Sequence, residues 1–180
     1  VTAITRTAAG SAYTSPPALT VSAPTTAGGV QATATAYLGN IIVVPTITSG
    51  GTGYAVNDVL TLSGGTFLSA STLTVTAVSG GVITAITVAT GGAYSVIPTG
   101  TISVTGGTGT GATFTISSWG VSTTFTITNA GSGYVEQPTV SFSGGGGSGA
   151  AAYATVGSGA IIRSLGQTGT SSLSFYTPMG

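Results

Sequence analysis

The chain has 180 residues with no cysteine and no histidine, and its formal net charge is zero because two basic and two acidic residues balance. This composition argues against catalysis, since a nucleophile needs a neighbouring base, and against metal binding, since zinc and calcium need several ligands. Two basic residues are too few for the phosphates of a nucleic acid, and no apolar run reaches the roughly 20 residues of a membrane span. We therefore expect no enzyme, no cofactor, no nucleic-acid partner and no membrane partner.

Threonine and serine alternate with apolar residues along most of the chain, which is the period-two pattern of strands with one buried face. Strong helix formers such as glutamate and lysine are scarce, whereas β-branched residues are abundant. A low net charge and a mean hydropathy of +0.55 argue against disorder. The sequence predicts an ordered all-β protein with no significant helix.

The first predicted strand lies around Ile4, and the turn Gly10-Ser-Ala-Tyr13 follows it. Pro17 then opens a second strand over residues 17–22, and proline suits that position because it lacks a backbone donor. A glycine-containing loop leads to a third strand over residues 31–38. Together these parts form a three-stranded unit.

Three more units repeat this order of parts. Their turns are Gly51-Thr-Gly53-Tyr54, Gly91-Gly-Ala-Tyr94 and Gly131-Ser-Gly133-Tyr134. Their strands lie around Ile47, at 58–63 and 71–78; around Ile86, at 101–104 and 111–117; and around Ile127, at 138–143 and 150–156. The four tyrosines are 41, 40 and 40 residues apart, and the residue four positions after each is Pro17, Asp58, Pro98 or Pro138. A fixed period of this length is typical of repeat architectures.

The repeat predicts four three-stranded units of about 40 residues, arranged as β-sandwich-like lobes or as an elongated β stack. We expect residues 1–80 to hold the first two units and residues 81–159 the other two, with a break near Gly80-Gly81. Residues 160–180 depart from the repeat and form a tail that we expect to dock onto a neighbour or to cap the fold. The tail contains Arg163, Phe175 and Tyr176, which are candidates for interface contacts.

The repeated turn has two interpretations. Glycine tolerates positive φ, and a tyrosine ring over a strand end, with its hydroxyl bonded to the backbone, would make the turn a structural joint. The alternative is a platform on which a sugar or base stacks. Four copies in one chain favour the joint. Asp58 and Glu136 occupy different positions of the repeat, which argues against a pair of glycosidase carboxylates.

Trp119 lies between the third and fourth units and breaks the pattern. It is either a buried plug between units or a residue that contacts a sugar or another chain. The glycine-rich stretches at 144–147 and 106–111 resemble phosphate-binding loops, but no lysine and no predicted helix follows them.

The fourth unit, FTITNAGSGYVEQPTVSFSGGGGSGAAAYATV at 125–156, resembles a repeat of structural proteins of tailed bacteriophages, especially marine and cyanobacterial ones. The shared pattern has the form G-x-G-Y-x-x-x-P, followed by T-V-x-F-S and a glycine run. Similar repeats occur in bacterial surface proteins and adhesins. The resemblance covers residues 1–157, is closest in the fourth unit and loosest in the third, and brings no catalytic residues.

The resemblance implies a non-enzymatic virion component, and we expect a capsid decoration protein on the virion surface. One alternative is a tail-fibre or adhesin module that binds host glycans through Trp119 and exposed tyrosines. Another is an extracellular filament built by strand exchange. Strand edges without charged residues favour association, so we expect a closed homo-oligomer, a trimer by analogy with the resembled class, in contact with a major capsid or tail protein.

Overall fold

The structure of the chain, a computed structural model, describes residues 1–157. Fourteen β-strands and no helix occur within these residues, so the all-β prediction is confirmed for this part of the chain. The strands follow the alternation of small polar and branched apolar side chains. In the strand Thr72–Ser79, for example, Leu73 and Val75 are buried, and the threonines beside them are more exposed.

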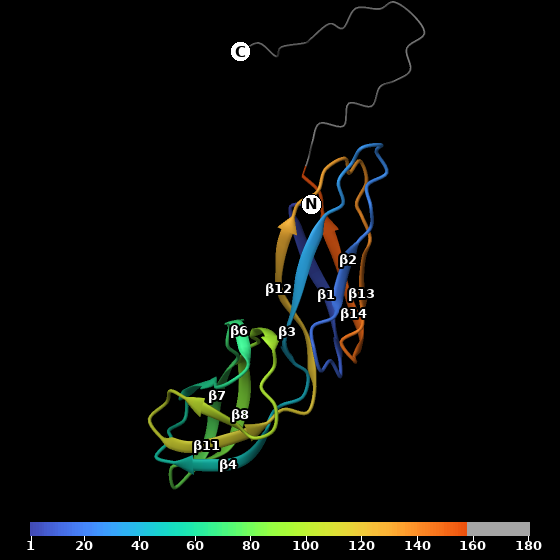
Figure 1. The fold of residues 1–180 in the computed structure, drawn as a ribbon. Helices are drawn as coiled ribbons and strands as arrows, with labels where there is room; N and C mark the ends of the chain where they lie inside the picture. Colours follow the sequence, from blue (N-terminus) through green and yellow to red (C-terminus); the bar gives the residue numbers. More distant parts are fainter. Residues whose placement is uncertain (158–180) are drawn as a thin grey trace, which may run out of the picture.

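The strands form two lobes that lie end to end along an elongated molecule (Figure 1). The first lobe combines the two ends of the described chain. Its strands are β1 (Ala3–Ser11), β2 (Ala18–Val21), β3 (Thr33–Ile41), β12 (Trp119–Asn129), β13 (Val140–Ser143) and β14 (Ser148–Thr155). They pair antiparallel as β1 with β14, β2 with β13, and β3 with β12. Further contacts of β1 with β12, β2 with β3 and β13 with β14 pack these three pairs together.

The second lobe is formed by the middle of the chain. Its main sheet has the order β4-β11-β10-β5-β7-β8, and contacts between the outer strands β4 and β8 bring it close to a closed barrel. These strands are β4 (Thr46–Thr52), β5 (Val59–Leu62), β7 (Thr72–Ser79), β8 (Val82–Thr90), β10 (Ile102–Thr105) and β11 (Thr110–Thr115).

Two short strands connect the lobes. β9 (Ala93–Val96) pairs with β3 of the first lobe through Leu38 and Tyr94, and its other side pairs with β6 (Thr66–Ser69). The resulting sheet has the order β12-β3-β9-β6. The sequence predicts a loop at β6 and a turn at β9, so the described residues contain more strands than the expected three per unit.

The strand pairing does not follow the expected division of the chain at residue 80. Residues 1–41 pair with 119–157, and β7 and β8 on either side of Gly80-Gly81 form one hairpin. Both glycines have positive φ, 58° and 79°, as a tight turn between right-twisted strands requires. The position expected to separate two lobes is therefore a hairpin turn inside the second lobe.

One hydrophobic core runs through both lobes. It includes Leu60, Leu62 and Phe114 from the second lobe and Leu38 and Val121 from the first. A smaller cluster, around Val21 and Ala154, fills the far end of the first lobe. Each fully buried leucine contributes about 1.5–3 kcal/mol through burial. No buried side-chain polar atom of the described residues lacks a hydrogen-bond partner.

Candidate functional site: the glycine–tyrosine turns and the tip of the first lobe

Three of the four repeated turns place a glycine backbone directly against the opposite strand. Their first glycines have φ values of 62°, 62° and 67°. A Cβ at these positions would stand 2.3, 2.4 and 2.5 Å from a carbonyl oxygen of the facing segment. The glycines are Gly10, Gly51 and Gly131, and the facing residues are Ser148, Thr110 and Val30, respectively. The turns therefore join segments far apart in sequence, and no other residue type fits there.

The turn at Gly91 departs from this arrangement. Here the next residue, Gly92, makes the close approach, since its Cβ would lie 2.7 Å from the carbonyl oxygen of Ser69. The Gly92 carbonyl lies against Gly39 of β3, where a Cβ would be 1.7 Å from the oxygen. This turn thus packs the second lobe onto the first. Gly91 and Arg6 line the same small cavity, and Arg6 Nη1 donates to the Val121 carbonyl at 2.5 Å.

The repeated tyrosines lie inside the fold. Tyr13, Tyr54 and Tyr94 are buried, and Tyr134 is half-buried. The rings of Tyr13 and Tyr54 cover Gly147 and Gly109, where a Cβ would be 2.5 Å from the nearest ring carbon. The buried rings offer no stacking face to a sugar or base.

Two tyrosine hydroxyls bind the backbone of the paired segment. The Tyr94 hydroxyl accepts from the Ser71 amide at 2.9 Å. The Tyr134 hydroxyl accepts from the Ala32 amide and donates to the Ser22 carbonyl, both at 2.9 Å. The Tyr94 bond holds the loop that precedes β7, and the Tyr134 bonds hold the loop that precedes β3.

The second glycines and the prolines of the turns complete the contacts. Pro17, Pro98 and Pro138 are buried. Gly145 lies against Pro17, and Gly65 lies against Pro98, each with its Cβ position 3.0 Å from the proline nitrogen. The second glycines are Gly53, which faces Gly109, and Gly133, which faces Gly29. Loop glycines thus enclose the turn of the facing segment.

Asp58, which replaces the proline in the second turn, binds the loop of the facing segment. Its Oδ2 accepts from the Ala55 amide at 3.0 Å, the Thr108 amide at 2.9 Å and the Thr108 hydroxyl at 2.8 Å. The hydrogen bond from Ala55, followed by the two from Thr108, lowers the pKa of the Asp58 carboxyl from its ordinary value. The carboxylate therefore has a structural role in the second lobe.

Trp119 is a plug between the lobes. Its side chain is only 3% exposed, and its ring centroid lies 5.3 Å from that of Tyr94 in an edge-to-face arrangement. Its carbonyl accepts from the Tyr13 amide at 3.1 Å. Since the indole has no free face, its position does not support sugar stacking.

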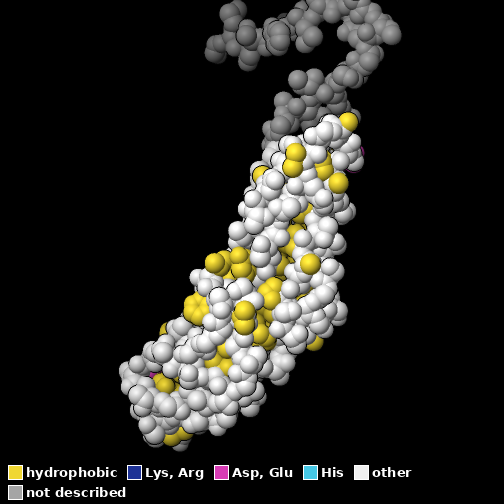
Figure 2. All heavy atoms as spheres, viewed as in Figure 1, with side chains coloured by type: hydrophobic (Ala, Val, Ile, Leu, Met, Phe, Trp, Pro, Cys, Tyr) yellow, Lys and Arg dark blue, Asp and Glu magenta, His cyan; other side chains and the backbone are white. Residues whose placement is uncertain are grey.

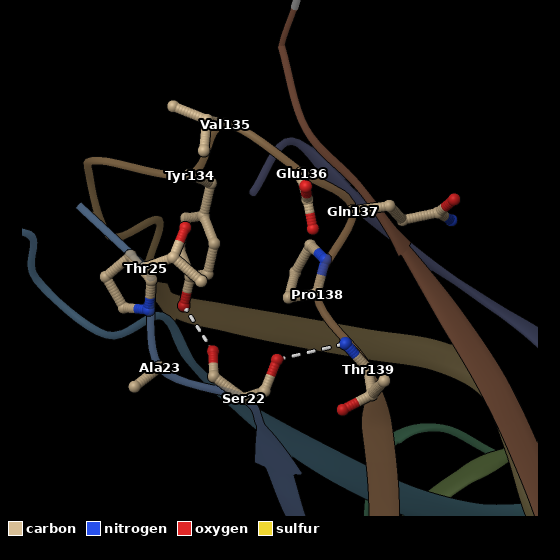
Figure 3. Close-up of a pocket in the computed structure, with 10 residues that line it drawn as sticks. Ser22, Ala23, Thr25, Tyr134, Val135, Glu136, Gln137, Pro138 and Thr139 are labelled. Atoms are coloured by element: carbon tan, nitrogen blue, oxygen red, sulfur yellow. Dashed lines mark hydrogen bonds between the residues drawn. The ribbon is translucent and has the colours of Figure 1, made fainter.

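The two carboxylates do not meet. Asp58 lies in the second lobe, whereas Glu136 is exposed in the loop at the tip of the first. Figure 3 shows the residues of this loop around a cavity of about 200 Å³ lined by 22–25 and 134–139. The Tyr134 hydroxyl points to Ser22, and the Ser22 hydroxyl accepts from the Thr139 amide at 3.0 Å (Figure 3). These polar groups of the cavity bind one another.

An open groove beside this cavity contains an exposed aromatic side chain. The groove has a volume of about 400 Å³ and lies between β13 and β14, lined by Gln137–Val140 with Ala152 and Tyr153. Tyr153 is 44% exposed. Tyr153 is not among the candidate residues expected from the sequence. Its position in alternation with Ala152 and the buried Ala154 could have indicated an outward-facing aromatic.

The glycine-rich stretches do not form open anion sites. In the stretch 144–147, the Gly145 carbonyl accepts from the Thr14 amide at 2.9 Å, and in 106–111, Thr108 binds Asp58. Among residues 1–157, no group of three or more His, Cys, Asp or Glu side chains could hold a metal ion. No helix in that range is long and apolar enough to cross a membrane. Arg163, Phe175 and Tyr176, with the tail at 160–180, lie outside the described residues.

Comparisons with protein-family models, curated proteins and solved structures find no match for this chain.

Proposed function

We propose that the chain is a non-enzymatic structural protein of a tailed-bacteriophage virion, and specifically a decoration protein that stabilises the capsid surface. The observation that supports this most is the use of the repeated residues. The turn glycines and tyrosines contact the backbone of facing segments and present no group to a ligand. A motif repeated for packing is what a structural protein requires.

The proposal includes a fold of four related three-stranded units that pair as first with fourth and second with third. In each pair, the first strand of one unit pairs with the third strand of the other, as β1 with β14 and β4 with β11. The second strands pair with each other, as β2 with β13 and β5 with β10. Each lobe then has an approximate two-fold arrangement. The similar placement of Gly10, Gly51 and Gly131 against facing carbonyls supports this arrangement.

The surface also suits a particle protein. The described residues carry three charged side chains, Arg6, Asp58 and Glu136, and Figure 2 shows a face covered almost entirely by uncharged groups. Such a surface has little charge for salt to screen, so its contacts would depend weakly on ionic strength. In this proposal the chain is a homo-oligomer at the virion surface that contacts a major capsid protein.

Co-sedimentation tests this function. Purified chain is mixed with capsid shells and, separately, with isolated tails of the phage that encodes it. We expect it to pellet with shells at a fixed stoichiometry that does not change between low and high salt. Binding to tails but not to shells would exclude a decoration protein.

A second candidate is recognition of a host-surface glycan in the groove beside Tyr153. An exposed tyrosine next to amide and hydroxyl groups is suited to stack on a sugar ring and bind its hydroxyls. Glycan-array binding that disappears in Tyr153→Ala but persists in Tyr37→Ala, a tyrosine on β3 of the same lobe, would favour this function. Absence of binding to any glycan would exclude it.

A further inference from the structure

The sheet that connects the lobes ends in an open edge. β6 (Thr66–Ser69) is the last strand of the order β12-β3-β9-β6, and all four of its residues are exposed. One side of β6 pairs with β9. Within residues 1–157, no strand pairs with its other side. Such an edge presents free backbone donors and acceptors to another strand.

Apolar side chains surround this edge. Phe67 is 45% exposed, Leu68 is 63% exposed and Val96, whose β9 position pairs with Thr66, is 59% exposed. Leu68 lies at an irregularity of the β6–β9 pairing, so no residue of β9 is opposite it. In Figure 2, hydrophobic side chains gather along the middle of the visible face, the part of the molecule where Figure 1 labels β6. We name Phe67, Leu68 and Val96 the β6 patch.

The β6 patch has none of the devices that usually prevent strands from pairing. Neither β6 nor β9 contains a charged residue or a proline. Of the three charged side chains in the described residues, Asp58 binds Ala55 and Thr108 in the second lobe, Arg6 donates to the Val121 carbonyl, and Glu136 lies at the tip of the first lobe. A strongly charged partner would find no opposite charge on β6 or β9. A second copy of this chain has the same uncharged, apolar edge and therefore matches it.

We propose that β6 is the contact between two copies of the chain, with the two β6 strands antiparallel around a two-fold axis. A register centred on Leu68 places the two Leu68 side chains directly opposite each other on the same face of the joined sheet, so that each covers the other. The pairing extends the connecting sheet from one molecule into the next. It predicts dimers in place of the trimer expected from the resembled class. This contact shares with the proposed function only the expectation that the chain associates with itself.

A single cysteine tests the contact, because the chain has no cysteine of its own. In the proposed register the two copies of position 68 are directly opposite each other across the axis and on the same face, at a Cα separation that a disulfide can span. We expect Leu68→Cys to form a disulfide-linked dimer in most molecules under mild oxidation. The matched control is Val135→Cys, which is 56% exposed at the far tip of the first lobe and should stay uncrosslinked.

A charge variant measures the strength of the contact. Leu68→Lys places two like charges side by side, so the dissociation constant of the dimer should rise about tenfold or more in sedimentation equilibrium. Val135→Lys should leave it unchanged, and circular dichroism checks that both variants fold. An unchanged dissociation constant in Leu68→Lys would overturn the proposal, as would a monomeric wild-type chain or the absence of a crosslink at position 68. A monomer that still binds capsid shells would overturn this contact and leave the decoration function standing.

Discussion

The Tyr94 hydroxyl and the Ser71 amide form a buried hydrogen bond of 2.9 Å at the junction of the two lobes. The Ser71 hydroxyl in turn accepts from the Gly92 amide at 2.9 Å, and the Gly92 carbonyl accepts from the Ser122 hydroxyl at 2.7 Å. Since Ser71 and Gly92 belong to the second lobe and Ser122 to β12, this network joins the lobes. The repeated tyrosine is therefore part of the inter-lobe structure.

Removing the Tyr94 hydroxyl should destabilise the protein. Tyr94→Phe keeps the ring but leaves the buried Ser71 amide without an acceptor, which costs about 1–3 kcal/mol of unfolding free energy. Urea denaturation measures this cost. The control is Tyr37→Phe, whose hydroxyl shares an exposed 3.1 Å hydrogen bond with Thr126 and whose loss should change stability by about 0.5 kcal/mol or less. Equal effects of the two variants would contradict the structural role of Tyr94.

The backbone contact at Gly51 predicts a large difference between two glycine substitutions. Gly51 and Gly100 have similar φ values of 62° and 68°, so alanine at either costs about 1–2 kcal/mol in backbone strain. A Cβ at Gly51 would stand 2.4 Å from the Thr110 carbonyl oxygen, whereas a Cβ at Gly100 meets nothing within 4 Å. Gly51→Ala should therefore lose about 1–3 kcal/mol more than Gly100→Ala in urea denaturation. If both lose the same amount, the close approach at Gly51 is not a constraint.

Asp58 should make the second lobe sensitive to acid. Because its hydrogen bonds lower the pKa in the folded chain, it stabilises the fold above its unfolded pKa, about 3.9, and that contribution is lost as pH falls through the lower folded pKa. The urea concentration at the unfolding midpoint of the wild type should fall as the pH is lowered from about 5 through the range below about 3.9 in which the folded-state carboxyl takes up its proton. Asp58→Asn should show a smaller drop over the same range. Parallel pH profiles would contradict a stabilising role for the carboxylate.

The strand pairing predicts which fragments fold. Residues 42–118 contain β4 to β11, including every strand of the six-stranded sheet, and should melt cooperatively when followed by circular dichroism. Residues 1–80 lack β12, β13 and β14, which are the partners of β3, β2 and β1. This fragment should show no cooperative melting transition. A folded 1–80 fragment would instead support the division expected from the order of the repeats.

The strands themselves could be predicted from the sequence because their alternation is local. The residues at 71–78 alternate hydroxyl-bearing and apolar side chains, and the strand Thr72–Ser79 follows them. The pairing of strands could not be predicted, because the four turns use the same residue types and any unit could face any other. The strand β6 could not be predicted either. It has only four residues, Thr66–Ser69, and lies between two glycines and a stretch of small residues.

The roles of individual side chains depended on that pairing. The sequence left Trp119 as either a plug or a sugar contact, and the choice follows from Tyr94, which β9 brings against it from the other lobe. For Tyr153, exposure follows from its place in β14 beside an open groove. Both outcomes depend on contacts between segments far apart in sequence, which a local pattern does not encode.

Immunogold electron microscopy of native particles, with an antibody against this chain, tests the central claim most directly. If the chain is a decoration protein, the label should cover the capsids in many copies and be absent from the tails. Label confined to tails or to the bacterial surface, or particles without label, would contradict the proposed function.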